Sequence, residues 1–248
     1  MGITSLTALG NAAYTAAAVS VPFIDSFIRR FKINFIDDER WLLLLGGLGN
    51  TLIISLMSVI LGSVIGGITA FMRMSKNPVS QWISGAYVNI IRGTPSFIQV
   101  LIIYFVVFNN ISLHKIFIAS IAFGINSGAY IAEIFRSGIM SIDKGQTEAG
   151  RSLGFTSAQT MRFIVFPQAI KNILPVLASE FIILIKETAV VGYIGVIDLT
   201  KAATSIQSRT YDAALPLIAA AVIYFIIIKI LTELFAKIEK ALRKADVR

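Results

Sequence analysis

Four strongly apolar stretches of this sequence run without a charged residue for about the length of a membrane crossing: 41–72, 93–113, 116–132 and 213–228. An α-helix needs about 20 predominantly apolar residues to cross the hydrocarbon core of a bilayer. Only 15% of the chain is charged, whereas about a quarter is usual in soluble proteins, and the mean hydropathy is +0.78. The sequence therefore predicts an all-α membrane protein.

We expect about five transmembrane helices, at residues 46–72, 90–109, 115–138, 166–190 and 213–235. Five crossings place the two termini on opposite sides of the membrane. If the C-terminus lies inside, 14 of the 22 Lys and Arg residues fall in inner segments and 7 in outer segments, with Lys186 in a span. Because inner loops carry the excess of bases, the prediction is an N-out, C-in topology.

Residues 1–40 are expected to form an N-terminal segment ahead of the membrane domain. In residues 23–41, aromatic residues and isoleucines are spaced among acids and bases, which is typical of a helix that lies in the headgroup plane and enters the first crossing as an elbow. Residues 1–22 are uncharged and alanine-rich, so they form either an extra crossing or a disordered tail. We expect no signal peptide, because residues 1–24 lack the positive n-region that one carries.

The formal charge of +8 has two possible explanations, a nucleic-acid partner or a topology signal. The bases lie beside the ends of apolar runs rather than on one soluble face, so we expect contact with membrane lipid and no nucleic acid. There is no cysteine and one histidine, His114, and H-E-x-x-H does not occur; G-x-S-x-G occurs once, at 150–154, within a polar connector between apolar runs. We therefore expect no metal site and no intramembrane protease activity.

Several local patterns predict breaks and contacts inside the membrane. Pro95 in the sequence RGTP, residues 92–95, removes a backbone donor and predicts a helix break. Two G-x-x-x-G matches, at 62–66 and 124–128, allow close helix contact. Glu133 and Arg136 are three residues apart, so they share a helix face and predict an ion pair.

Ionisable groups within a bilayer are costly and face a partner or a cavity. Glu180, in the fourth predicted crossing, has no base three or four residues away. It is the main candidate for contact with the ammonium group of a solute, although a partner on another helix would satisfy it as well. Glu187, Thr188 and Ser127 are weaker candidates for a substrate path.

A polar connector lies between the third and fourth predicted crossings. Residues 144–153 favour a helix, with Asp143 ahead of it and Gly154 after it as a stop. Thr156 with Gln159 three residues later fits a capping box that begins a second helix. From these residues alone, the connector is either a built helix-turn-helix for a partner or an ordinary well-capped loop.

The spacing within this connector resembles the EAA loop of the inner-membrane permease subunits of binding-protein-dependent ABC importers, which reads E-A-A-x3-G-x9-I-x-L-P. The matching positions are Glu148, Ala149, Gly150, Gly154, Ile164 and Pro167. Two positions depart from the pattern, because Gly150 replaces the third-place Ala and Phe166 replaces Leu. The spacing over 20 residues is intact.

Further stretches resemble the polar amino-acid subfamily of these permeases, the histidine, arginine and glutamine type. They are IRGTPSFIQVLIIYF (91–105), GAYIAEIFRSGIMSIDKGQTEAGRSLGF (128–155), FPQAIKNILPVLASEFI (166–182) and IKETAVVGYIGVIDLT (185–200). The resemblance implies a type I ABC importer (MetI-like) permease fold over residues 41–248. It also implies a coupling loop at 141–167 and a place in the bacterial inner (cytoplasmic) membrane.

The resemblance further implies a multi-pass subunit that forms the translocation path of an ATP-driven amino-acid importer. Its partners would be a cytoplasmic ABC ATPase dimer, a second copy of itself or a similar permease, an extracytoplasmic solute-binding protein and the amino acid. The motif G-x-x-x-x-G-K-[ST] is absent, so we expect ATP and Mg²⁺ in the ATPase. We expect no cofactor and no enzyme activity in this chain. The alternative is a stand-alone dimeric secondary transporter or channel for a small polar solute, which needs no docking turn.

Overall fold

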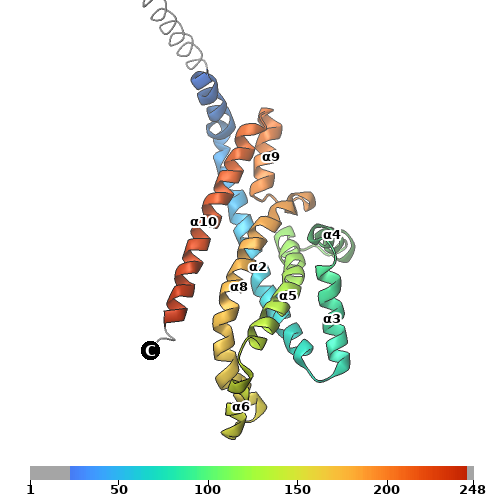
Figure 1. Cartoon of the computed structure of the whole chain (residues 1–248). Coiled ribbons are helices and arrows are strands. Elements are labelled where there is room, and N and C mark those ends of the chain that lie inside the picture. The colour runs from blue at the N-terminus through green and yellow to red at the C-terminus, as the bar shows by residue number, and fades with distance from the viewer. Residues whose placement is uncertain (1–22, 245–248) are drawn as a thin grey trace, which may run out of the picture.

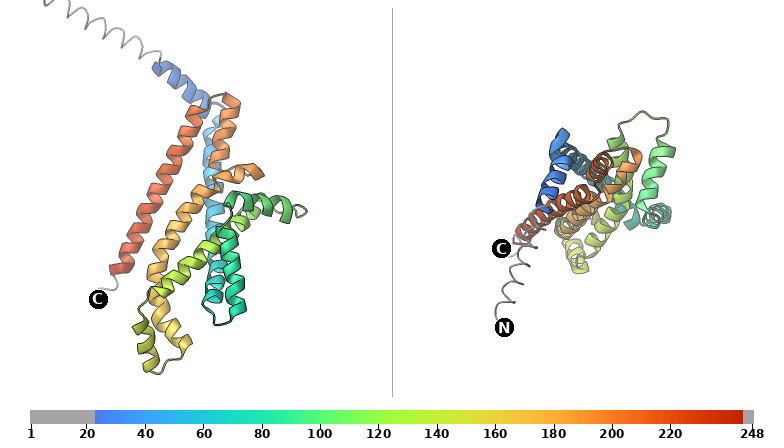
Figure 2. Two further views of the ribbon diagram at one scale, coloured as in Figure 1. Left: turned by 45° about the vertical axis from the view of Figure 1, so that its right-hand side comes forward. Right: turned by 90° about the horizontal axis from the view of Figure 1, so that it is seen from above.

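The computed structural model describes residues 23–244, and every regular element within them is helical (Figure 1). A helical segment at 23–31 leads into the bundle. The α-helices that follow are α2 (Trp41–Met74), α3 (Pro78–Arg92), α4 (Ser96–Ile102), α5 (Lys115–Met140), α6 (Lys144–Ser152), α7 (Ser157–Thr160), α8 (Phe166–Glu187), α9 (Leu199–Thr210) and α10 (Ala214–Lys244). The α6 region projects at the end of the bundle opposite to the 23–31 segment (Figures 1 and 2). The alternatives for residues 1–22 lie outside the described residues.

Three helices are long and apolar enough to cross a membrane: Trp41–Met74, Lys115–Met140 and Ala214–Ala241. They contain the first, third and fifth predicted crossings. The fourth, α8, has 22 residues and carries four charged side chains within them, so its composition resembles that of a buried helix more than a lipid-exposed one. It ends at Glu187, where the adjacent Lys186 and Glu187 close the helix.

The second predicted crossing, 90–109, is wrong as a single helix. The structure instead has α3 and the segment Ser96–Val107, which meet at an angle of 105°. The predicted break at RGTP is confirmed: α3 ends at Arg92 and α4 begins after Pro95. The sequence prediction missed α3 because its Asn, Gln and Ser side chains make it less apolar than a typical membrane crossing. The start of the helix is marked instead by the cap at Asn77, whose side chain accepts a hydrogen bond from Val79 N.

The side chain of Gln99 holds the bend between α3 and α4 together. Its amide nitrogen donates to the carbonyl oxygen of Ile91 at 2.8 Å and to the hydroxyl of Thr94 at 2.7 Å. Its amide oxygen accepts from Asn126 Nδ2 on α5 at 2.9 Å. Both amide side chains are buried, so this network fixes backbone groups that the break leaves without helical partners.

Replacing Gln99 with Leu is expected to destabilise the protein by about 1–3 kcal/mol, because the Asn126 amide then stays buried without this partner and the Ile91 carbonyl loses its donor. The measurement is the thermal unfolding midpoint of the detergent-solubilised protein. Gln81→Leu on the exposed side of α3 is the matched control, because the Gln81 amide donates to a carbonyl at the water-exposed end of the helix. Equal midpoints for the two variants would show that the network contributes nothing to stability.

The centre of the bundle is the packing of α2 against α5, and both predicted G-x-x-x-G motifs lie in it. A side chain at Gly62 or Gly66 would approach Gly128, Ile131 or Ala132 of α5 to within 2.8–3.2 Å. Conversely, a side chain at Gly124 or Gly128 would meet Leu61 or Ile65 of α2. The small residues therefore let the two backbones approach closely, as the motif predicts.

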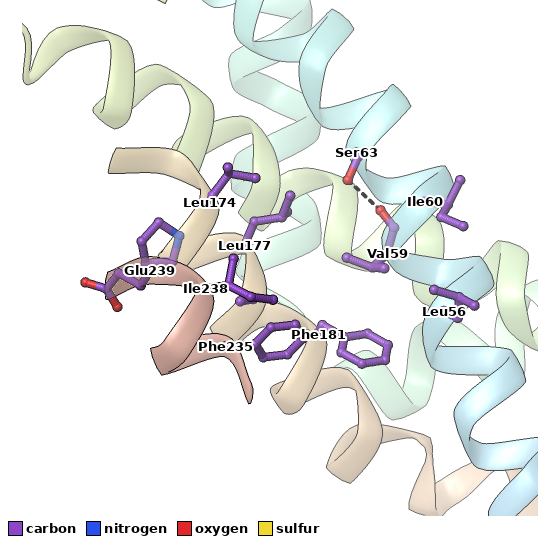
Figure 3. Close-up of a pocket in the computed structure, with 12 residues that line it drawn as sticks. Leu56, Val59, Ile60, Ser63, Leu174, Leu177, Phe181, Phe235, Ile238 and Glu239 are labelled. Atoms are coloured by element: carbon purple, nitrogen blue, oxygen red, sulfur yellow. Dashed lines mark hydrogen bonds between the residues drawn. The ribbon is translucent and has the colours of Figure 1, made fainter. Parts of the chain in front are cut away.

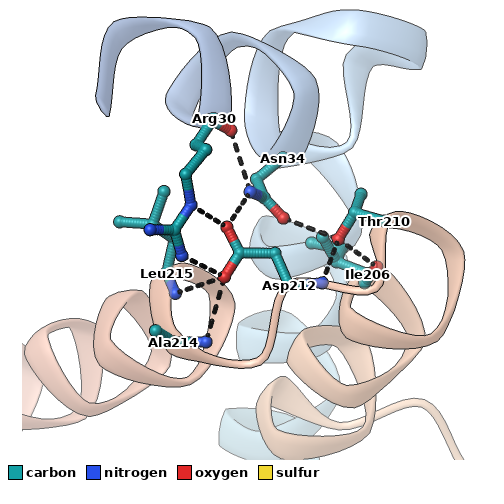
Figure 4. A network of polar contacts seen from close by, with 7 residues as sticks. All are labelled: Arg30, Asn34, Ile206, Thr210, Asp212, Ala214 and Leu215. Atoms are coloured by element: carbon teal, nitrogen blue, oxygen red, sulfur yellow. Dashed lines mark hydrogen bonds and ion pairs between the residues drawn. The ribbon is translucent and has the colours of Figure 1, made fainter. Parts of the chain in front are cut away.

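A polar network joins the N-terminal segment to the junction of α9 and α10 (Figure 4). The Asp212 carboxylate accepts two hydrogen bonds from the Arg30 guanidinium, one from Nε at 2.9 Å and one from Nη2 at 2.6 Å. It also accepts from Asn34 Nδ2 at 2.8 Å and from the backbone N of Ala214 at 3.1 Å. These contacts cap α10 and join it to the N-terminal segment; that this segment lies in the headgroup plane as an elbow stays a prediction.

The hydrogen bonds from Arg30 and Asn34 hold the pKa of Asp212 at about 2, below its ordinary value of 3.8. A depressed carboxyl pKa adds stability that is present above about pH 4 and is lost as the pH falls toward 2. Asp212→Asn is therefore expected to lower the unfolding midpoint at neutral pH by no more than about 4 °C, because Arg30 is solvent-exposed. Midpoints measured from pH 7 to pH 2 test this, and the gap between variant and wild type should close at the acid end.

Candidate coupling hairpin and membrane-embedded polar site

The connector after α5 folds into a helical hairpin made of α6 and α7. Asp143 begins α6 by accepting from Gly145 N at 2.7 Å. After Ser152 the chain reverses at Gly154, whose φ of +85° lies in the left-handed region. Phe155 N then donates back to the carbonyl oxygen of Gly150 at 3.2 Å. The predicted acid cap and glycine stop are both confirmed.

The second arm of the hairpin begins with the predicted capping box. Thr156 N donates to Gln159 Oε1 at 2.8 Å, and Gln159 N donates to Thr156 Oγ1 at 3.2 Å. From there α7 passes through a π-helical turn at Met161–Val165 into α8. The second arm of the hairpin is thus nearly continuous with α8, and the chain reverses tightly at the tip of the hairpin.

The glycine that replaces the third-place Ala lies inside this hairpin. Gly150 is the buried residue of α6, and a methyl group there would lie 2.7 Å from Ile164 Cδ1 and 2.9 Å from Thr160 Cγ2. Gly150 therefore allows α6 to pack against the second arm. Glu148 and Ala149 are exposed, so they are the surface that the first arm presents.

The charge on the hairpin is also available to a partner. Among residues 23–244, the carboxylate of Glu148 makes no hydrogen bond or ion pair. Arg151 uses its guanidinium to donate to the carbonyl oxygen of Phe155 at 2.7 Å, across the reversal. Ile164 is half-buried against Gly150, and Pro167 lies exposed near the start of α8. The reversal is thus internally braced, while the Glu148 carboxylate is left exposed.

Three of the four predicted substrate-path residues lie together within the bundle. Glu180 of α8 is 7% exposed, and Ser127 of α5 and Glu187 of its own helix lie close enough to act on its carboxylate. The hydroxyl of Ser127 is buried without a hydrogen bond that meets ordinary geometry. Thr188 is buried as well, but its hydroxyl donates to the Ile185 carbonyl at 3.0 Å, so it does not join this group.

No Lys or Arg within residues 23–244 forms an ion pair with Glu180. A second acid of the bundle, Glu133, is neutralised: it pairs with Arg136 at 2.8 Å, as predicted, and also with Arg73 of α2. The difference between the two acids is informative, because a buried carboxylate without a basic partner is costly unless something else compensates its charge. Unlike Glu133, Glu180 leaves this role open to a ligand.

Sequence reasoning missed two polar residues beside this group, Gln99 and Asn126. Asn126 precedes Ser127 on α5 and is 2% exposed, and its partner Gln99 lies 27 residues earlier in the chain. Each is an amide within an uncharged run, which is the signal that would have marked them. Their pairing is set by the bend before α4, which the sequence does not specify.

The family model for the binding-protein-dependent transport system inner membrane component matches residues 58–244. Among curated proteins, the putative glutamine transport system permease protein GlnP of Rickettsia typhi is 41% identical over 192 residues, 77% of this chain and 88% of that protein. The arginine transport system permease protein ArtQ of Bacillus subtilis is 37% identical, over 82% of this chain and 94% of that protein.

The solved structures agree with the fold. A chain from the crystal structure of an amino acid ABC transporter with histidines is 40% identical and superposes with a TM-score of 0.77, over 84% of this chain and 98% of that one. A chain of the MetNI methionine ABC transporter is 22% identical with a TM-score of 0.70, over 82% of this chain and 97% of that one, which supports the fold alone. The predicted all-α, MetI-like permease fold is confirmed. The chain belongs to the family of inner membrane components of binding-protein-dependent transport systems.

Proposed function

We propose that this chain is the permease subunit of an ATP-driven importer for a polar amino acid, and that it forms the translocation path. The observation that carries the proposal is the braced hairpin of α6 and α7 with its exposed Glu148, which continues into the helix that bears Glu180. The second arm of the hairpin thus joins a surface for a partner to a membrane-embedded acid.

The hairpin is the proposed coupling element. Glu148, Ala149 and Gly154 form the docking turn for a cytoplasmic ATPase subunit, whereas Gly150 and Ile164 pack its two arms and Pro167 begins the membrane helix. The proposal places ATP and Mg²⁺ in that partner, since the chain lacks a P-loop sequence. It assigns no cofactor and no enzyme activity to the permease itself.

The proposed solute site centres on Glu180, with Ser127 and Glu187 beside it. A carboxylate without a basic partner attracts the ammonium group that every zwitterionic amino acid carries, and a charge-assisted hydrogen bond of this kind contributes about 1.5–3 kcal/mol. Relatives named for glutamine, arginine and cystine transport support a polar amino acid as the substrate class.

The rest of the assembly follows from this assignment. The chain is proposed to pair with a second copy or a similar permease, and to receive its substrate from an extracytoplasmic solute-binding protein. The hairpin end, with the C-terminal end of α10, then faces the cytoplasm, and the N-terminal segment with the α9–α10 junction faces outward. This is the N-out, C-in arrangement that the distribution of bases predicts.

Reconstitution into liposomes tests the proposal. The liposomes combine the chain with an ATPase that has a P-loop and a solute-binding protein, both from neighbouring genes. Uptake of labelled amino acids is measured with and without ATP on the side of the membrane where the ATPase is bound. Import that requires ATP and the binding protein is the expected result. Uptake by the chain alone, driven by an ion gradient, would instead support the stand-alone secondary transporter.

A further inference from the structure

Two hollows of the structure differ in the chemistry of their walls. One measures about 440 Å³ and lies between α2, α8 and α10, where side chains such as Leu56 and Phe181 make its wall mainly apolar (Figure 3). The other measures about 560 Å³ and lies between the N-terminal segment and the α9–α10 junction, with Arg29, Tyr211 and Asp212 in its lining. We call this second one the polar hollow. Its charged and hydrogen-bonding side chains are available to a polar partner.

Tyr211 stands at the rim of the polar hollow and packs against nothing in its own chain. The residue is 95% exposed, and its side chain makes no hydrogen bond or ring contact within residues 23–244. Its backbone ends α9 with a φ of +56°, the left-handed conformation that glycine usually supplies at this position and that a Cβ disfavours. A strained residue without a packing role indicates a function outside the fold.

The charges around the polar hollow are not balanced. Arg30 is paired with Asp212, whereas Arg29 is exposed and makes no hydrogen bond or ion pair within residues 23–244. Arg209, two residues before Tyr211, is also exposed and likewise without such a bond in that part of the chain. Because complementary charges steer and orient docking, the rim favours a partner with acidic side chains.

The polar hollow lies on the side of the N-terminal segment that is turned away from its apolar face. The rings of Phe27 and Phe31 lie together on that face, with 6.4 Å between their centroids. Arg29 is two residues from each of them, so at about 100° per residue its side chain leaves the helix about 160° from theirs. With the phenylalanines toward lipid, as an interfacial helix requires, Arg29 and the hollow face water. This geometry favours a water-soluble partner over the bilayer.

The position of the hollow along the bundle determines which water-soluble partner is present. It lies at the end opposite to the α6–α7 hairpin (Figures 1 and 2), which in the proposed orientation is the extracytoplasmic side. We propose that the polar hollow docks the solute-binding protein, with the Tyr211 ring as the anchor and Arg29 as the contact for an acidic side chain. Tyrosine is among the residues that carry most binding energy at protein interfaces. The inference rests on the proposed function, because that function supplies the partner.

Tyr211→Gly tests the anchor, because it removes the ring and suits the left-handed backbone. The affinity of the solute-binding protein for the full permease–ATPase complex in nanodiscs is expected to fall by about 10- to 30-fold, while the unfolding midpoint stays equal or rises. Glu39→Gly is the matched control, because Glu39 is exposed at the same end with a φ of +52°, and it should leave the affinity unchanged. Equal affinities in the two variants would overturn the proposal.

Arg29→Glu tests the charged contact. Binding of the solute-binding protein is expected to weaken by about fivefold or more, because an acidic side chain of the partner would then meet a like charge. The control is Lys32→Glu, which makes the same change in net charge at an exposed position outside the hollow. Equal weakening in both variants would show a long-range field alone and would refute the contact at Arg29.

A labelling experiment covers the case in which these substitutions disturb folding. The chain has no cysteine, so Tyr211→Cys introduces a single thiol for a membrane-impermeant maleimide. The solute-binding protein should slow the labelling of Tyr211→Cys by about fivefold or more, because an interface anchor is shielded from water, and should not slow that of Glu39→Cys. Labelling that the binding protein does not slow would contradict the docking surface. A thiol that reacts only after detergent is added would assign position 211 to the lipid interface and overturn the proposal.

The wild-type complex separates this inference from the proposed function. If it binds the solute-binding protein and imports amino acid, the function stands, and the affinity of Tyr211→Gly decides the docking surface alone. A wild-type complex that neither binds the solute-binding protein nor imports amino acid would overturn the proposed function, and the docking surface with it.

Discussion

Gly154→Val is expected to uncouple ATP hydrolysis from amino-acid uptake while the protein still inserts into the membrane. The residue sits at the reversal of the α6–α7 hairpin with a φ of +85°, and nothing lies within 4 Å of where its side chain would start. The penalty is therefore backbone strain alone, about 1–3 kcal/mol for a residue with a Cβ in this region, and more for a β-branched one. In Gly154→Val the turn is expected to relax to a negative φ to relieve this strain, which moves the exposed Glu148 away from its docking position.

The measurement compares ATP hydrolysis with uptake in the reconstituted transporter. Uptake should fall by about tenfold or more, since a ~1.4 kcal/mol change in coupling is a factor of ten, while hydrolysis by the ATPase continues. Gly85→Val is the matched control, because that glycine also faces open space but has no positive φ. Equal losses of uptake in the two variants would argue against a coupling role for the turn.

Glu148→Ala addresses the same interface without touching the backbone. The side chain is exposed and makes no hydrogen bond or ion pair within residues 23–244, so its loss is expected to leave the stability of the permease unchanged. Any fall in uptake then reports a lost contact with the partner. An unfolding midpoint equal to that of the wild type, together with uncoupled hydrolysis, is the expected combination; unchanged uptake would count heavily against the importer assignment.

The hairpin was predictable from the sequence because its determinants are local. Asp143 two residues before Gly145, and Thr156 three residues before Gln159, specify caps whatever the rest of the chain does. The role of Gly150 was not predictable, because the residues that fill the space above it, Thr160 and Ile164, reach it only after the turn has formed. The sequence motif identifies the glycine, and only the packing explains it.

In the membrane region too, features set by local sequence were predictable and features set by packing were not. The three most apolar helices follow from hydropathy, since burial in lipid depends on composition alone. The 105° bend between α3 and α4 does not, because Pro95 sets the position of a break but no angle. The hydrogen bond from Asn126 to Gln99, 27 residues earlier in the chain, joins the bent segment to α5, and no local pattern predicts this pairing. The approach of Ser127 to Glu180 likewise depends on how α5 packs against α8.

Glu180→Gln is expected to reduce uptake by about 10- to 100-fold. The substitution keeps the size of the side chain and one oxygen that accepts a hydrogen bond, but it removes the charge and replaces the second oxygen with an NH₂ donor. Loss of a charge-assisted bond to the substrate ammonium corresponds to about 1.5–3 kcal/mol, which gives this range. The expected signature is weaker binding of the amino acid with ATPase coupling intact, the reverse of the Gly154 variant.

Two comparisons separate a substrate contact from a structural role. Glu233→Gln removes a carboxylate that is 59% exposed and pairs with Lys229 on α10, and it should leave uptake unchanged. In a structural role, the neutral glutamine side chain of Glu180→Gln would lower the desolvation cost of this buried position, so the protein would gain thermal stability without losing affinity. A substrate contact instead predicts that stabilisation of the protein by added amino acid, measured as a shift in the unfolding midpoint, disappears in Glu180→Gln.

Because Ser127 lies beside Glu180 and its hydroxyl is buried without a hydrogen bond of ordinary geometry, Ser127→Ala should weaken the same stabilisation to a smaller extent.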